Sequence, residues 1–277
     1  MSSIRFLITR RVVQITILLL YFGGNYYGWK MLSGDLSSSS ILGIIPLSDP
    51  YAVLQMFVAG AVISSNILIG AVIIFLFYAI LGGRAFCSWV CPVNIITDAA
   101  NWTSRKFGFD MVAKKQPSSR NLRYWVLVIS LIISFFLGLT AFEFISPISM
   151  IHRGIIFGMG FGWAAMAILY LFDLFVLKNG WCGHICPLGG FYSIIGRFRL
   201  LKVKHDSEAC TGCMKCKVVC PEVQVLHMID KVSIPVTSGE CTNCGRCIDV
   251  CEDNALGFFL KVENNNKKGE INNEKNE

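Results

Sequence analysis

CTGCMKCKVVCP, at residues 210–221, decides the fold of the C-terminal part together with a second run, CTNCGRCIDVC, at residues 241–251. Each run has two C-x2-C steps followed by a C-x3-C step. This spacing is typical of bacterial two-cluster ferredoxins, in which three thiolates of one run and the fourth cysteine of the other hold one [4Fe–4S] cubane. The predicted ligands are Cys210, Cys213, Cys216 and Cys251 for cluster 1, and Cys241, Cys244, Cys247 and Cys220 for cluster 2.

Zinc and disulfide bonds are the other uses of such cysteines. Thiolates also bind zinc, but a zinc ribbon needs only two C-x2-C knuckles, fewer than this chain has. Disulfides are disfavoured in a reducing cytoplasm, where the charge pattern below places these runs. The second run departs from the ferredoxin pattern at Glu252, which stands where the first run has Pro221, without loss of a ligand.

Two further cysteine pairs lie upstream, each in a C-x3-C-P motif that follows an apolar run. They are Cys87 and Cys91 before Pro92, and Cys182 and Cys186 before Pro187. The upstream part therefore consists of two repeated helical hairpins that end in the same motif. Parallel repeats place equivalent parts around an axis along the membrane normal, which predicts that both pairs meet at the cytoplasmic membrane surface.

The prolines suggest how these upstream cysteines are placed. A proline disfavours the α region for the residue before it, so Cys91 and Cys186 are predicted N-caps of helices that begin at Pro92 and Pro187. A cysteine at a helix N-terminus has a lowered pKa and thiolate character. Three uses stay open for the four cysteines: a thiolate redox relay, a further metal or Fe–S site, or packing of two interface turns.

The composition places the upstream part in a membrane. Of 277 residues 54% are hydrophobic and 16% charged, with a mean hydropathy of +0.56. These values exclude an ordinary soluble enzyme and a disordered chain. Four apolar runs are long enough to cross a bilayer as helices, and they cover residues 12–29, 55–81, 125–142 and 155–177.

Basic residues in the connecting segments predict the orientation. Seven lie in segment 84–123 and five in segment 178–204, whereas segments 30–52 and 143–153 have one each. Both termini are therefore predicted on the cytoplasmic side of a bacterial inner membrane. The net charge is +11 over residues 1–204; we interpret it as a topology signal, and no nucleic-acid partner is expected.

The predicted fold class is a membrane all-α domain of four transmembrane helices followed by an α+β two-cluster ferredoxin domain. The membrane domain covers residues 1–204 and the ferredoxin domain residues 205–262. Residues 205–277 have a net charge of −4. Residues 263–277 are rich in asparagine and nearly free of apolar side chains, which predicts a disordered tail.

Haem is not expected as a cofactor. The four histidines, at positions 152, 184, 205 and 227, all lie outside the long apolar runs, where a cytochrome b would need haem ligands. No C-x-x-C-H motif for covalent haem attachment occurs.

Four apolar runs, two C-x3-C-P pairs and a two-cluster tail together resemble the NapH-type membrane subunit of periplasmic nitrate reductase systems. The resemblance covers residues 1–260. It implies a quinol dehydrogenase subunit that takes electrons from the quinone pool. A periplasmic Fe–S partner of the NapG type would then carry the electrons towards nitrate reductase.

A second hypothesis comes from the wider family that shares these motifs. It includes MauN-like proteins, the membrane part of nitrous-oxide reductase regulators, and oxidase-assembly proteins of the FixG/RdxA type. The chain would then be an Fe–S membrane protein for the assembly or regulation of a metalloenzyme. The last two groups are longer, with an extra flavin-bearing or immunoglobulin-like domain that is not expected in a chain of this length.

Overall fold

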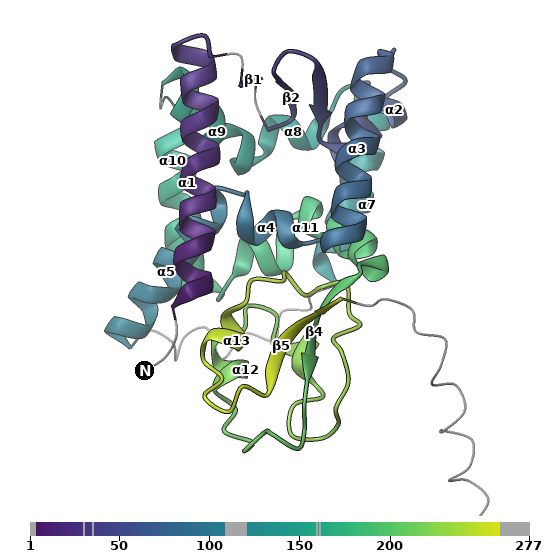
Figure 1. Cartoon of the computed structure of the whole chain (residues 1–277). Coiled ribbons are helices and arrows are strands. Elements are labelled where there is room, and N and C mark those ends of the chain that lie inside the picture. The colour runs from purple at the N-terminus through teal and green to yellow at the C-terminus, as the bar shows by residue number, and fades with distance from the viewer. Residues whose placement is uncertain are drawn as a thin grey trace, which may run out of the picture.

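A computed structural model describes residues 4–29, 31–34, 36–108, 121–158, 160 and 162–260. The chain forms two stacked parts, a larger helical part and a smaller C-terminal part beneath it (Figure 1). The predicted disordered tail, residues 263–277, lies outside the described residues.

Four apolar helices run along a common axis through the helical part (Figure 1). They are α1 (Arg5–Tyr26), α3 (Ser65–Leu81), α7 (Leu122–Leu137) and α10 (Gly162–Leu171), which continues in the π-helical turn η1 (Phe172–Val176). Among the described residues α1 alone is both long and apolar enough to cross a membrane unaided, while the other three have 10–17 residues. The four transmembrane helices therefore stay a prediction.

Three of the four predicted apolar runs are divided in the structure. Run 55–81 is split between α2 (Pro50–Val58) and α3, and α2 begins with Asp49 as its N-cap. Run 125–142 is interrupted after α7 by Gly138, whose φ of +66° is a left-handed conformation that favours glycine. The chain then forms α8 (Ala141–Ile145) and α9 (Pro147–Phe157), which precede α10.

The helical part also contains a three-stranded antiparallel sheet, which the all-α prediction missed. Its strands are β1 (Leu32–Gly34), β2 (Ser38–Ile41) and β3 (Ile45–Ser48), with Ser39 paired to Leu47. The strands are too short to show a clear alternation of polar and apolar residues. The sheet lies at the end of the helices away from the C-terminal part (Figure 1).

Short helices that follow or contain the upstream cysteines form a layer between the sheet and the C-terminal part (Figure 1). They are α4 (Ala85–Trp89), α5 (Val93–Phe107), η2 (Trp181–Ile185), α11 (Pro187–Ile195) and η3 (Gly196–Phe198). Cys186 is the N-cap of α11, as predicted. In the first repeat Pro92 takes that place, one residue later than predicted.

The C-terminal part has an α+β arrangement. Strands β4 (Leu201–His205) and β5 (Leu256–Leu260) pair antiparallel, and three short helices lie between them in sequence. The predicted boundary at residue 204 falls inside β4. The helices are α12 (Lys215–Val219), η4 (Val223–Leu226) and α13 (Arg246–Asp249).

Candidate functional site

Four cysteines surround one small cavity in the C-terminal part. Three come from the second cysteine run and one from the first, and they are Cys241, Cys244, Cys247 and Cys220. Most of the remaining wall is apolar, with Val203, Val225 and Val236 among its residues. The fold thus brings together the ligand set that the spacing predicts for cluster 2.

A second small cavity has the complementary set around it. Its cysteines are Cys210, Cys213, Cys216 and Cys251. The fourth cysteine of each run lies with the first three cysteines of the other run. This arrangement follows because α12 of the first run and α13 of the second run pack against each other. Ile229 and Leu256 complete an apolar wall, so this cavity has the soft donors and the low polarity that an iron–sulfur cluster requires.

The structure brings the four upstream cysteines into one core. Cys91 and Cys186 are buried there, and Cys87 and Cys182 pack against the same group of side chains. Burial, together with the neighbouring cysteines, raises the pKa of the Cys182 thiol well above its ordinary value. This thiol lies 3.7 Å from Oγ1 of Thr97 on α5, which connects the two repeats.

Burial acts against the predicted thiolate character of these cysteines. Burial raises the pKa of Cys186 to about 12, although the N–H groups of Leu188 and Gly189 at the start of α11 act to lower it. Burial likewise raises the pKa of Cys91 well above its ordinary value. The helix N-terminus is present as expected, but loss of solvation outweighs it.

The first C-x3-C-P motif touches the loop that carries the cluster 2 cysteines. Oγ of Ser88 donates to the carbonyl of Thr242 at 2.7 Å, and Nε1 of Trp89 donates to the carbonyl of Asn243 at 3.1 Å. Ser88 and Trp89 lie between the two cysteines of their motif, and the two acceptors lie between Cys241 and Cys244. The first motif therefore lies against the loop of the second cysteine run.

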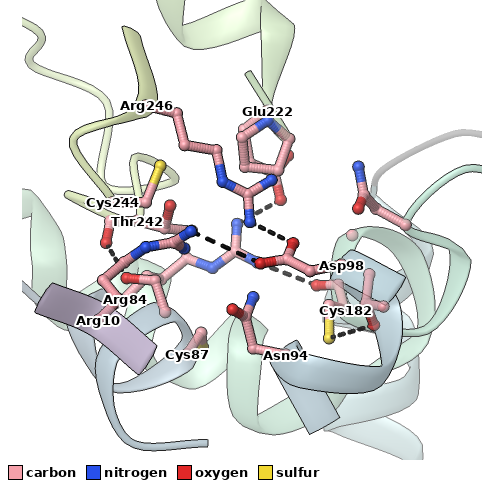
Figure 2. A pocket seen from close by; sticks show the side chains of 15 residues that line it. Arg10, Arg84, Cys87, Asn94, Asp98, Cys182, Glu222, Thr242, Cys244 and Arg246 are labelled. Atoms are coloured by element: carbon pink, nitrogen blue, oxygen red, sulfur yellow. Dashed lines mark hydrogen bonds and ion pairs between the residues drawn. The ribbon is translucent and has the colours of Figure 1, made fainter. Parts of the chain in front are cut away.

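A single small cavity joins both groups of cysteines. Cys87, Cys182 and Cys244 all line it, and Figure 2 shows them around a set of arginines and acids. Asp98 on α5 pairs with Arg11 of α1 and with Arg246 of α13. These ion pairs connect the first helix, the first motif and the C-terminal part.

A buried ion network lies beside this cavity. Nη1 of Arg84 lies 2.5 Å from Oε1 of Glu222, and Arg123 reaches the two oxygens of the same carboxylate at 3.2 and 3.3 Å. Arg84 also donates to the carbonyl of Cys182 at 2.9 Å. Burial acts to lower the pKa of Arg84, but Glu222 outweighs it and the pKa is raised. Glu222 follows Cys220 by two residues, so the network ties both motifs to the end of the first cysteine run.

The N-terminus of α1 packs on the same loop. The backbone N–H of Phe6 donates to Oδ2 of Asp249 at 3.0 Å. A Cβ at Gly245 would lie 2.4 Å from the Phe6 ring, so only glycine permits this contact. Gly245 lies between Cys244 and Cys247, so the first turn of α1 packs against the second cysteine run.

Sequence reasoning missed the charged residues that lie between the helical part and the C-terminal part. Arg84, Glu222 and Asp98 stand close to cysteines in the sequence, and that proximity was the available signal. Nothing in the sequence shows that they are buried or which partner each one meets, because the pairs join segments that are far apart along the chain.

Paired cysteine cavities joined to apolar helices define an iron–sulfur electron-transfer protein of the ferredoxin type. A family model described as a 4Fe-4S dicluster domain matches residues 202–252. A model described as a 4Fe-4S binding domain matches residues 66–110 and 157–204, one for each C-x3-C-P motif. The two matches support the predicted repeat.

Known relatives cover nearly the whole chain. Ferredoxin-type protein NapH of Haemophilus influenzae is 42% identical over 94% of this chain and 91% of its own length. Methylamine utilization ferredoxin-type protein MauN of Methylorubrum extorquens is 44% identical over 91% and 88%, and NapH of Escherichia coli is 41% identical over 92% and 89%. The chain belongs to the family of NapH and MauN ferredoxin-type proteins, which confirms the predicted resemblance. No solved structure matches it.

Proposed function

We propose that the chain is a multi-pass inner-membrane subunit that oxidises quinol. It would pass the electrons through a periplasmic Fe–S partner of the NapG type towards periplasmic nitrate reductase. The observation that carries the proposal is the contact of Ser88 and Trp89 with the cluster 2 loop. This contact joins a redox-capable group in the apolar helical part to an iron–sulfur cavity in the C-terminal part.

The proposed cofactors are two [4Fe–4S] clusters, held by the two cysteine sets that line the C-terminal cavities. Each cluster would carry one electron at a time. The four upstream cysteines form a third redox or metal site in this proposal. The 4Fe-4S binding model that matches both of their repeats supports a further Fe–S group there.

Several observations support the proposed topology. Helices α3, α7 and α10 present many exposed large apolar side chains, including Phe75, Phe136 and Ile168. The start of α1 touches α13 through Phe6 and Asp249, so the N-terminus and the C-terminal part lie on one side of the helices (Figure 1). The basic connecting segments predict that this side is cytoplasmic.

The cluster assignment predicts the metal content. Anaerobically purified protein should be brown and contain acid-labile sulfide, with about eight irons in two cubanes. Replacement of all four upstream cysteines by serine should leave these irons in place. Any iron lost in that variant belongs to the upstream site, whereas stoichiometric zinc without sulfide in the native protein would contradict the clusters.

Deletion of the gene tests the function. Nitrate reduction that depends on quinol should fall strongly in the deletion strain, while nitrate reduction with an artificial electron donor should be unchanged. The physical reason is that an artificial donor reduces the terminal enzyme directly and bypasses this subunit. Purified protein should also be reduced by quinol, alone and with a periplasmic Fe–S partner.

A second candidate function is the assembly or regulation of a metalloenzyme, the hypothesis that comes from the wider family with these motifs. The similarity to a methylamine utilization protein, MauN, keeps a role other than nitrate respiration open. If the chain serves assembly, the deletion strain would lose nitrate reduction with both donors, because the terminal enzyme itself would be incomplete. The same deletion experiment therefore separates the two functions.

A further inference from the structure

A larger cavity, of about 220 Å³, lies in the helical part. We call it the sheet-side cavity. It is bounded by α1, α3, the sheet and the layer of short helices around the upstream cysteines, which we call the cysteine layer. Ile17 of α1 and Ile74 of α3 line its sides, and Leu47 of β3 lines the sheet side. Figure 1 shows β1 and β2 above this region and α4 and α11 below it.

The cysteine-layer side of the cavity is aromatic. Phe86 and Tyr192 are stacked with their ring centroids 5.2 Å apart, and Tyr78 meets Tyr192 edge to face at 5.2 Å. All three rings line the cavity. Such a surface suits a flat aromatic ring, which gains from offset or edge contacts as well as from burial.

One carboxylate lies in the cavity wall. Asp49 caps α2 by accepting the backbone N–H of Tyr51 at 3.2 Å, and Oη of Tyr192 lies 3.5 Å from the same oxygen. None of the described residues that line the cavity is Lys or Arg. The cavity is thus apolar except for an acid and a few hydroxyl groups, which is the usual composition of a site for a small, mostly apolar ligand.

The cavity also reaches the first C-x3-C-P motif. Phe86 and Val90 line it, and each is the direct neighbour of a motif cysteine, Cys87 or Cys91. A ligand in the cavity would therefore lie between Asp49 on the sheet side and the redox-capable cysteines on the side of the C-terminal part. Protons and electrons could leave it in opposite directions.

We propose that the sheet-side cavity binds the ring of the quinol, with its isoprenoid tail leaving between α1 and α3, and that Asp49 accepts the protons. This assignment rests on the proposed function. Both O–H bonds of the quinol break and its C–O groups become carbonyls. The two electrons would go, one to each, to two oxidised iron–sulfur groups held by the cysteines of the chain. The two protons pass in turn to Asp49 and from there to water at the sheet end.

The pH dependence of the rate follows from Asp49. Burial raises the pKa of its carboxyl to about 7. The ionisable groups around it are Tyr21 of α1, Tyr51 of α2, Tyr78 of α3, Tyr192 of α11 and Glu143 of α8. Only the carboxylate accepts a proton, so the rate of quinol oxidation should rise with pH through about 7 and level off above it. The variant Asp49→Asn should lack this rise.

Stopped-flow reduction of the full, cluster-loaded protein in lipid nanodiscs tests the proposal. Decylubiquinol and menadiol serve as benzoquinol and naphthoquinol donors. In Asp49→Asn the rate should fall at least about 100-fold, the typical contribution of a general base, while dithionite still reduces the clusters fully. Asparagine is as good an N-cap as aspartate, so α2 is retained.

A pair of tryptophan variants tests the position of the ring. Ile74→Trp fills the cavity and should abolish both quinol-driven reduction and photolabelling by an azido-benzoquinone. Ile73→Trp is the matched control, because Ile73 lies one residue away on α3, is exposed and does not line the cavity; it should behave as the native protein.

The outcomes distinguish a failure of the proposed function from a failure of the cavity assignment. If neither quinol reduces the native protein, the proposed function fails and the site with it. If quinol reduces the native protein but Asp49→Asn and Ile74→Trp stay within twofold of it, the cavity assignment is wrong while the function stands. In the native protein the photolabel should fall on peptides that line the cavity; label confined to other segments also overturns the assignment, without relying on a variant that folds.

Discussion

Replacing Cys91 or Cys186 by serine is expected to abolish quinol-driven reduction of the C-terminal clusters, with a loss of at least about 100-fold in rate. Both sulfurs are buried in the core that also holds Cys87 and Cys182, and this core touches the cluster 2 loop. Serine keeps much of the shape but is a poor ligand for soft metals and a poor nucleophile at neutral pH. Stopped-flow reduction by quinol measures the effect, with dithionite reduction and tail-cluster content as controls.

The double variant distinguishes one site from two. Residues that act as a unit give non-additive effects, so the double serine variant should be no slower than either single one. Losses that multiply would instead mean two independent sites. Full quinol oxidation in every single variant would show that the upstream cysteines only pack.

The variant Glu222→Gln is expected to destabilise the protein by about 3–5 kcal/mol, as the loss of one partner from a buried ion pair does. The Glu222 side chain is 2% exposed, and the side chains of Arg84 and Arg123 are 2% and 0% exposed. Without the carboxylate, the buried guanidinium of Arg84 loses its counter-charge, while Arg123 keeps Glu240 at 3.5 Å. The measurement is the thermal midpoint for loss of the visible cluster absorbance.

Glu252→Gln is the matched control for this change. Glu252 lies next to Cys251, much as Glu222 lies near Cys220, and it pairs with Lys215 at 2.8 Å. The side chains of this pair are 62% and 53% exposed, so water screens the pair and its loss should leave the thermal midpoint nearly unchanged. Equal shifts of the thermal midpoint in Glu222→Gln and Glu252→Gln would show that the buried network does not hold the helical part and the C-terminal part together.

Local features of the sequence were sufficient to predict which residues lie together in much of the candidate site. The spacing of cysteines within a run decides which thiolates can lie on one tight turn, and the structure places both predicted sets around separate cavities. The proline after Cys186 likewise marked the start of α11. The repeat of the C-x3-C-P motif was visible because each copy follows an apolar run of similar length.

The same local reasoning failed for properties that depend on the packing of distant segments. It predicted thiolate character for Cys186 from the helix N-terminus, but the pKa is raised because the surrounding core removes solvent. It also missed β1, β2 and β3, whose serine-rich strands are held by pairing with each other and not by a pattern of their own.

The sequence by itself determined which cysteines share a cavity, that two motifs repeat, and that the upstream part is apolar. These properties depend on spacing and composition along short stretches of chain. Only the tertiary structure decided that the first motif contacts the loop between Cys241 and Cys244, that Arg84 meets Glu222, and that Asp49 meets Tyr192. Each of these pairs joins residues more than a hundred positions apart, and their burial and charge exist only once the distant segments have packed together.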